Sequence, residues 1–309
     1  MSMNRSPSLP EVAPRGPATR QVAIVCESTC CLPPDLARRY DIGIIPIPFV
    51  FGTQTFRDGV DITPAQFYAR LAETGTPPKT SPPSPGEYLQ AWREASRSAS
   101  AVLLVTVDGR VSTLQRSARL AQEMAPQALP GVAVSVVDSQ SAGMGQGFVA
   151  LAAARAAMAG QPLAAVTAAA ERVRRRVTLL VTLDTLEYLS RASRLPQVAT
   201  FVGGLLAIKP VVQFSGGHIR LLARPRTRRR AIDELFERVA RTVPPGARLH
   251  AAVQHAGAEV EAADFEVRLR GAFDCAELYT TEFTPVMGGY CGPGLLGVAF
   301  YSEENGDGR

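Results

Sequence analysis

Lysine is almost absent from this chain of 309 residues. Lys79 and Lys209 are its two lysines, so arginine supplies nearly all of the 33 basic residues, the net charge of +5 and the pI near 9.1. Aromatic residues make up only 6% of the chain and are not interleaved with the arginines, so surfaces on which bases could stack are scarce. We therefore expect no nucleic-acid binding. The arginine run at 172–176 fits a solvated helix face, and the run at 224–230 stays open between such a face and a functional role.

Cysteine and histidine are also scarce. The five cysteines are an odd number in a chain too long to depend on disulfides, which favours a reducing cytoplasm. They are Cys26, Cys30, Cys31, Cys275 and Cys291. The chain has no CxxC pair, and its three histidines lack HExxH or HxH spacing, so we expect no metal site.

Long apolar runs are missing as well. No segment reaches 18 uninterrupted apolar residues, which predicts no membrane span, and residues 1–20 lack the apolar stretch of a signal peptide and are expected to form a flexible tail. The chain is 46% hydrophobic and 20% charged, as is typical of a globular protein. Its length is near the limit for a single core, so we expect two lobes with a cleft between them.

The first lobe is predicted over residues 21–176. Short apolar runs predict strands at 21–28, 42–51, 101–107 and 132–139. Helices are expected at 33–40, 63–73, 84–98, 112–124, 145–159 and 163–176. Thr63 is expected to cap the second of these helices, and Ser84 with Glu87 forms the capping box of the third. Strands that alternate with helices predict a mostly parallel sheet.

The second lobe is predicted over residues 177–304 as an α/β lobe with a mixed sheet. Strands are expected at 177–183, 209–214, 218–222, 250–256, 276–283 and 295–301. Helices are expected at 184–192 and 227–242, and a third is expected to end near 269. The chain is thus predicted to be a two-lobed α/β protein.

A glycine-rich turn follows the predicted strand at 132–139. Gly143, Gly145 and Gly147 are spaced as GxGxG, whereas dinucleotide-binding turns have GxGxxG after the first strand of the sheet. A tight turn that packs a helix against the sheet is the favoured interpretation, and a nucleotide-dependent enzyme that uses this turn is the alternative. The chain contains no GxSxG elbow, Walker loop or kinase signature.

Hydroxyl side chains recur where predicted strands or loops lead into helices. They are Ser28, Thr29, Thr80, Ser81, Ser84, Ser112 and Thr113. Each alone fits a helix cap. In an open α/β sheet, however, the loops after the strands meet at one crevice, where hydroxyls and helix N-termini can together hold an anionic group.

Several ordered motifs give the chain a resemblance to a known family. They are IVCESTCCLP at 24–33, FRDGVDI at 56–62, KTSPPSPGEY at 79–88, GRVSTLQRSA at 109–118, DSQSAGMGQG at 138–147, LEYLSRASRL at 186–195, LLAIKPVV at 205–212, PRTRRRAI at 225–232 and GPGLLGVAF at 292–300. Over residues 21–301 the chain resembles the DegV family of fatty-acid-binding proteins, which includes the binding subunits of bacterial fatty acid kinase.

The resemblance implies a DegV-like fold with a long-chain fatty acid, such as hexadecanoate, in an apolar tunnel between the lobes. The carboxylate would be held by Thr80, Ser81, Ser112, Thr113 and Tyr290. About sixteen carbons at roughly 0.8 kcal/mol per buried CH2 contribute on the order of 10 kcal/mol before ordering costs. The protein would then be a binding protein with no catalytic residues and no cofactor.

The resemblance also implies a partner. In the kinase system the binding protein presents the carboxylate to a separate ATP-binding catalytic subunit, which forms an acyl phosphate. Arg194 and Arg226 stand at two arginine positions of the family and are expected to contact the phosphate or the partner.

Some positions depart from the family pattern and mark the chain as a divergent member. Tyr290 stands where the family has a histidine, and Thr113 replaces the glycine of the SGT motif. Glu27 and Cys31 replace aspartates of the opening motif. Because tyrosine donates a hydrogen bond but does not titrate near neutral pH, the change at Tyr290 bears more on acyl-phosphate handling than on lipid binding.

Overall fold

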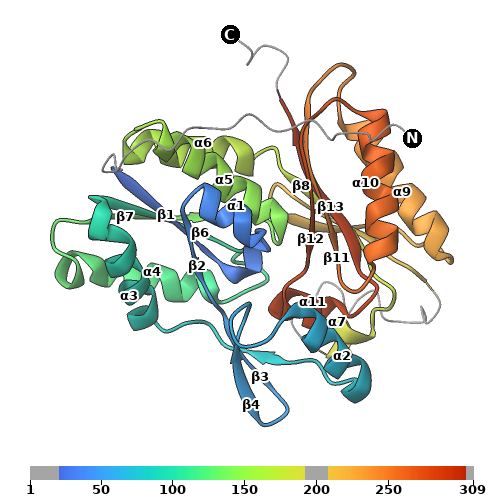
Figure 1. The fold of residues 1–309 in the computed structure, drawn as a ribbon, viewed down its shortest axis with the longest axis horizontal. Coiled ribbons are helices and arrows are strands. Elements are labelled where there is room, and N and C mark those ends of the chain that lie inside the picture. The colour runs from blue at the N-terminus through green and yellow to red at the C-terminus, as the bar shows by residue number, and fades with distance from the viewer. Residues whose placement is uncertain (1–20, 192–207, 304–309) are drawn as a thin grey trace, which may run out of the picture.

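The computed structural model describes residues 21–191 and 208–303. Within these residues the chain forms a mixed α/β fold, with a parallel sheet, a larger mixed sheet and a small antiparallel sheet (Figure 1). The expected α/β fold, with a parallel and a mixed sheet, is confirmed. No described helix combines the length and the apolar character needed to cross a membrane.

The parallel sheet is built from the first half of the chain, in the order β2-β1-β6-β7. Its strands are β1 (Val22–Glu27), β2 (Ile42–Ile45), β6 (Ala101–Thr106) and β7 (Ala133–Asp138). All three pairings are parallel, and every residue of β6 is buried, as expected for a strand covered on both faces.

Helices cover both faces of this sheet. Those around it are α1 (Pro34–Arg39), α3 (Pro85–Ala95), α4 (Leu114–Ala128), α5 (Met144–Met158) and α6 (Leu163–Arg174). α3 and α4 share a core with one face, and α5 and α6 share a core with the other. α5 is buried nearly all round its circumference, because its far side packs against the mixed sheet.

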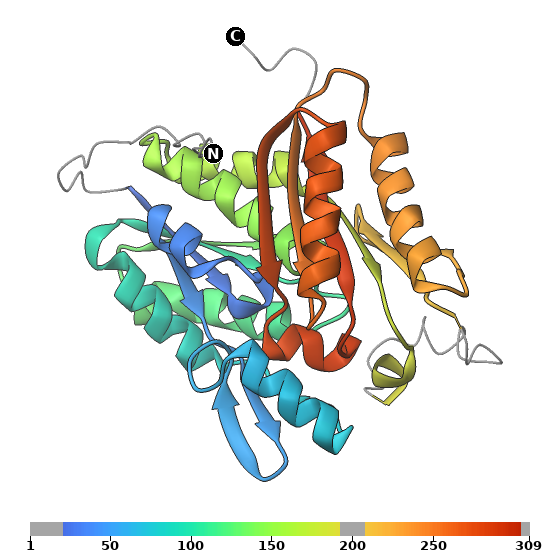
Figure 2. The same cartoon turned by 45° about the vertical axis from the view of Figure 1, so that its right-hand side comes forward.

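The mixed sheet has the order β10-β9-β8-β13-β11-β12. Its strands are β8 (Thr178–Thr182), β9 (Val211–Ser215), β10 (His218–Ala223), β11 (Leu249–His255), β12 (Cys275–Glu282) and β13 (Leu296–Ser302). β11 and β12 run parallel and the other neighbours run antiparallel. α9 (Arg228–Thr242) and α10 (Glu259–Ala272) cover the face turned away from α5 (Figure 2). The expected lobe boundary at 176/177 falls between α6 and β8, and the division into lobes stays a prediction.

The small sheet is a departure from the sequence-based prediction. Residues 42–51 were expected to form one strand, but the chain leaves β2 at Ile45 and starts a new strand, β3 (Pro48–Phe51), in another sheet. Pro46 and Pro48 cannot donate ladder hydrogen bonds, which explains the break. β3 pairs with β4 (Gln54–Arg57) and with β5 (Lys79–Thr80).

Helix ends follow the local sequence. α2 (Pro64–Thr74) and α3 begin with complete capping boxes at Thr63 and Ser84, as predicted. α4 begins at Leu114 rather than Ser112 and runs to Ala128, four residues past the predicted end. The short helices α7 (Glu187–Arg191) and α11 (Pro285–Cys291) lie near each other below the mixed sheet. α11 was not predicted, because its sequence, PVMGGYC, reads as a loop.

Candidate functional site: an apolar pocket with a hydroxyl end

A pocket of about 1150 Å³, mouth included, lies between the parallel and the mixed sheet. Its apolar lining comes mainly from the face of β8, β9 and β10 that is turned toward the parallel sheet, and from α7 and α11. Leu179, Val181, Val212, Phe214, Ile219 and Leu221 form the strand part of this lining. None of the described lining residues carries a formal charge at neutral pH.

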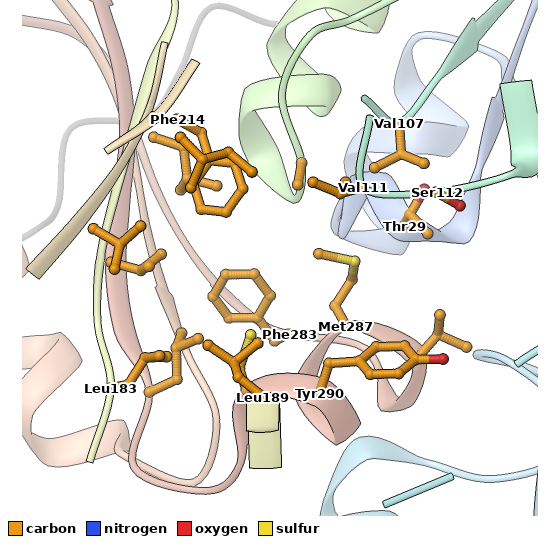
Figure 3. Close-up of a pocket in the computed structure, with 18 of the residues that line it drawn as sticks. Thr29, Val107, Val111, Ser112, Leu183, Leu189, Phe214, Phe283, Met287 and Tyr290 are labelled. Carbon is orange, nitrogen blue, oxygen red and sulfur yellow. The ribbon is translucent and has the colours of Figure 1, made fainter. Parts of the chain in front are cut away.

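Four hydroxyl-bearing residues also line the pocket. Thr29, Thr80, Ser112 and Tyr290 come from four separate segments of the chain. Figure 3 shows Thr29, Ser112 and the Tyr290 hydroxyl on one side of the pocket, with Phe214 and Leu183 on the opposite side. We call this group of four the hydroxyl end. Thr80, Ser112 and Tyr290 belong to the site predicted from the sequence, and the fold brings all three to one pocket.

Ser112 lies in the loop between β6 and α4. Its Oγ accepts a hydrogen bond from the backbone N–H of Leu114 at 3.3 Å and donates none to a described residue. The hydroxyl hydrogen is thus available to a ligand. Since Leu114 is the first residue of α4, Ser112 also lies beside the positive end of a 15-residue helix, where negative charge is stabilised.

Thr80 and Tyr290 form the closest pair of the hydroxyl end. The Thr80 Oγ1 and the Tyr290 hydroxyl oxygen are 2.5 Å apart. Thr80 ends β5, and Tyr290 lies on α11, more than 200 residues later in the chain.

Two glycines of α11 allow this approach. A Cβ at Gly288 would lie 1.8 Å from the Tyr68 hydroxyl oxygen of α2, and a Cβ at Gly289 would lie 2.5 Å from Cγ of Pro78. Side chains at these two positions would push α11 away from α2 and from the segment before Thr80. The glycines before Tyr290 therefore help to position its hydroxyl.

Thr29 is a lining residue that the predicted site did not include, although it was among the junction hydroxyls. It lies in the short 3-10 helix Ser28–Cys30 after β1. Its hydroxyl donates to Oε1 of Gln146 at 2.8 Å. Because that one hydrogen is used inside the protein, Thr29 offers a ligand acceptor lone pairs and a methyl group rather than a donor.

A buried glutamate stands behind Thr29. Glu27 is fully buried and accepts hydrogen bonds from the Val107 backbone N–H at 2.9 Å and from the Tyr88 hydroxyl at 2.7 Å. Burial raises the pKa of Glu27 to about 7 despite these hydrogen bonds. Burial thus favours the protonated, neutral form of this carboxyl group, which lies just outside the pocket wall.

The other predicted site residues lie elsewhere. Ser81 is exposed beyond β5, and its backbone N–H donates to the carbonyl of Pro48 at 3.2 Å. Thr113 is exposed at the N-cap of α4, and Arg226 is exposed ahead of α9. None of the three is in the pocket lining. Arg194 lies outside the described residues, so its expected role stays a prediction.

The glycine-rich turn at 143–147 is buried and its amides are already bonded. The N–H of Gly143 donates to the carbonyl of Thr29, and the N–H of Met144 donates to Oε1 of Gln254 at 2.9 Å. A Cβ at Gly143 would lie 2.7 Å from the same Gln254 oxygen. The turn packs α5 against β11 and leaves no open cradle for a phosphate, which favours the packing interpretation over the nucleotide-binding one.

The fold and pocket together define an α/β protein with an apolar pocket between two sheets. The family model described as "Uncharacterised protein, DegV family" matches residues 21–303. A DegV domain-containing protein from Streptomyces coelicolor is 34% identical over 287 residues, which cover 92% of this chain and all of that protein. The chain belongs to the DegV family.

Solved structures agree with this assignment. A DegV family protein from Thermus thermophilus, whose structure is described as fatty acid binding, has a TM-score of 0.83 and 31% identity. DegV from Bacillus subtilis, described as a fatty acid binding protein, has a TM-score of 0.84 and 29% identity. Each similarity covers 92% of this chain and all of the other chain.

Proposed function

We propose that this protein binds one long-chain fatty acid in the pocket between the sheets, with the carboxylate at the hydroxyl end and the acyl chain against β8, β9 and β10. The observation that carries the proposal is the division of the pocket into an apolar wall and a hydroxyl end. The fatty acids bound by structural relatives support the chemical class of the ligand.

The two parts of the pocket have different energetic roles. Burial of the acyl chain supplies most of the affinity, at roughly 0.8 kcal/mol per CH2. The carboxylate loses water when it enters the pocket, so it needs donors there. Ser112 has an uncommitted hydroxyl hydrogen, and a carboxylate oxygen can take the place of the bond between Thr80 and Tyr290. These charge-assisted hydrogen bonds fix the orientation of the acid.

In this proposal the protein is a carrier and not itself a catalyst. A separate ATP-binding subunit, of the fatty acid kinase type, would phosphorylate the carboxylate presented at the hydroxyl end. The exposed position of Arg226 suits contact with such a partner better than contact with a ligand inside the pocket. Addition of a kinase subunit and ATP to the loaded protein should yield acyl phosphate only when both proteins are present.

Lipid extraction tests the proposed ligand. Protein expressed in cells should release one equivalent of C14–C18 fatty acid on denaturing extraction, as measured by mass spectrometry, and the delipidated protein should take up such an acid again. A delipidated protein that is folded but takes up no C14–C18 acid would refute the proposal. Thermal stabilisation by NAD(P) or ATP, with none by fatty acids, would support the nucleotide-dependent alternative instead.

A further inference from the structure

A second group of potential ligand atoms lies on the other face of the mixed sheet. His255 is the last residue of β11, Glu282 is the last residue of β12, and the two are direct partners in the parallel register. Glu259 is the first residue of α10, four residues after His255. One ligand atom from each of the three side chains lies within 4.8 Å of the other two.

The local chain path explains how the three side chains meet. Gly257 has φ of +62°, a conformation that favours glycine, and it turns the chain from the end of β11 into α10. Thr280, two residues before Glu282, donates its hydroxyl to Glu266 of α10 at 2.6 Å. Because side chains alternate along a strand, Glu282 shares that α10-facing side. The group is therefore separated from the fatty-acid pocket by the sheet itself.

His255 is the buried member of this group. His255 is 7% exposed, and its Nδ1 has no partner among the described residues. Buried polar atoms in folded proteins nearly always have a hydrogen-bond partner, so an unpaired buried ring nitrogen indicates a water, ion or ligand as its partner.

The two glutamates differ from their neighbours in having no basic partner within the described part of the chain. Two other glutamates of α10 have arginine partners. Glu261 pairs with Arg228, and Glu266 pairs with Arg270. Glu259 and Glu282, by contrast, make no ion pair with any described residue. Because a carboxylate oxygen of Glu259 and one of Glu282 lie within 4.8 Å of each other, the two negative charges repel.

The donor set narrows the class of cation. One imidazole nitrogen and two carboxylate oxygens suit Zn²⁺ and similar first-row divalent ions, whereas Mg²⁺ and Ca²⁺ prefer oxygen ligands alone. Neighbouring ligands of a tetrahedral zinc ion lie roughly 3.4 Å apart when the bonds are about 2.1 Å. The ligand atoms of the three side chains lie within 4.8 Å of one another, which is somewhat more than this spacing. Because Glu259 is exposed, a rotation of its side chain can bring its carboxylate closer to the other two ligands.

We propose that His255, Glu259 and Glu282 bind a divalent transition-metal cation of the Zn²⁺ class. The cation joins the first turn of α10 to the ends of two parallel strands and offsets the repulsion between the two carboxylates. The sequence analysis expected no metal site. The proposed ligands lie on β11, α10 and β12, so no metal-binding spacing motif in the sequence marks them.

Zinc titration of the whole chain tests this proposal. The protein is stripped of metal with a chelator, kept reduced, and titrated with Zn²⁺ against a chromophoric competitor. The wild type should bind one equivalent at least tenfold more tightly than Glu259→Gln or Glu282→Gln. Glu261→Gln, which changes the paired carboxylate two residues away, should bind as the wild type does. Equal Zn²⁺ affinity of wild type, Glu259→Gln and Glu282→Gln would overturn the proposal.

Two further measurements test whether the ion is bound by these side chains and whether it belongs to the Zn²⁺ class. Co²⁺ bound at this site should show no thiolate charge-transfer absorption, and a thiolate band lost only on substitution of a cysteine would place the ion at a cysteine instead. Mg²⁺ at the same concentration should not displace the bound ion, and equal competition by Mg²⁺ would overturn the assigned class of cation. Both glutamates are at least partly exposed, so their glutamine variants are expected to fold and to match the wild-type melting temperature without metal.

Discussion

The two walls of the pocket are built differently. The wall on the parallel-sheet side includes Thr29, which follows β1, and Ser112, in the loop after β6. The wall on the mixed-sheet side is made of strand residues of β8, β9 and β10 that carry only apolar side chains into the pocket. Loops at the carboxyl ends of parallel strands thus supply polar groups, and the antiparallel strands supply the apolar surface.

Two glutamates, Glu27 beside the parallel sheet and Glu277 on the mixed sheet, also differ from each other. Glu27, behind the parallel-sheet wall, is bonded to uncharged donors, and burial raises its pKa to about 7. Burial alone would also raise the pKa of Glu277 on β12, but hydrogen bonds from His250 and Arg155 outweigh burial and lower it to about 2. The carboxyl group behind the parallel-sheet wall of the pocket can therefore be neutral, whereas the one on the far edge strand of the mixed sheet, outside the pocket lining, is ionised.

The largest predicted effect is at the apolar wall. Ile219→Glu places a carboxylate where the acyl chain is proposed to lie, and fatty-acid affinity should fall about a thousandfold, or about 4 kcal/mol. Calorimetric titration with palmitate measures this loss. Arg220→Glu on the same strand is exposed and outside the lining, so it should leave affinity nearly unchanged. Equal losses in the two variants would contradict the assigned role of this wall.

The contrast between the two glutamates predicts opposite pH effects on stability. The pKa of Glu27 is raised in the folded protein, so its contribution to stability is fully present below about pH 4.5 and is lost as the pH rises through about 7. The loss amounts to about 3 kcal/mol. Denaturant unfolding at a series of pH values should show this loss in the wild type and not in Glu27→Gln.

Glu277→Gln is the matched comparison for Glu27→Gln. The folded-state pKa of Glu277 is lowered to about 2, so its contribution is present above about pH 4.5 and is lost as the pH falls through 2. The glutamine variant should therefore remove stability at neutral pH and flatten the acid side of the profile. If the free energy of unfolding changed with pH in the same way in Glu27→Gln and Glu277→Gln, the two glutamates would not have the different environments described here.

A smaller effect is expected at the hydroxyl end. Ser112→Ala removes the uncommitted donor, and palmitate affinity should fall by about 1–3 kcal/mol, because a buried carboxylate loses a charge-assisted bond. Thr113→Ala removes the neighbouring, exposed hydroxyl and should change affinity little. Should Thr113→Ala weaken binding as much as Ser112→Ala, the exposed threonine would be part of the site.

The smallest effect is expected for Tyr290→Phe. The change keeps the ring in the lining and removes the hydroxyl that lies 2.5 Å from Thr80, so affinity should fall by about 0.5–1.5 kcal/mol. Thr80→Val should give a similar loss. Because the two hydroxyls act as a pair, the double variant should lose less than the sum of the single variants, as tested by a double-mutant cycle on palmitate affinity.

The sequence predicted the elements that depend on neighbouring residues and missed those that depend on distant contacts or on ambiguous prolines. The capping boxes at Thr63 and Ser84 and the buried strand β6 are set by nearby residues, so they were predicted. The break at Pro46 was missed because a proline at a sheet edge is compatible with either one strand or two. α11 was missed because its glycines serve contacts with Tyr68 and Pro78, which lie more than 200 residues away.

The pocket, too, has residues that the sequence could predict and residues that it could not. Ser112, Thr80 and Tyr290 were found through motifs, whereas the side chains of the apolar wall could not be distinguished in the sequence from ordinary core residues. Thr29 was noticed as a junction hydroxyl, but its bond to Gln146 depends on the packing of α5 against β1. Which hydroxyl still has a hydrogen to donate is a property of the folded structure alone.

A titration of the delipidated protein with palmitate labelled with ¹³C at its carboxyl carbon tests the central claim most directly. We predict one protein-bound carboxyl resonance at a stoichiometry of one, shifted by Ser112→Ala and not by Thr113→Ala. A folded protein that gives no bound resonance, or one that the Ser112 change leaves unmoved, would contradict the placement of a fatty-acid carboxylate at the hydroxyl end.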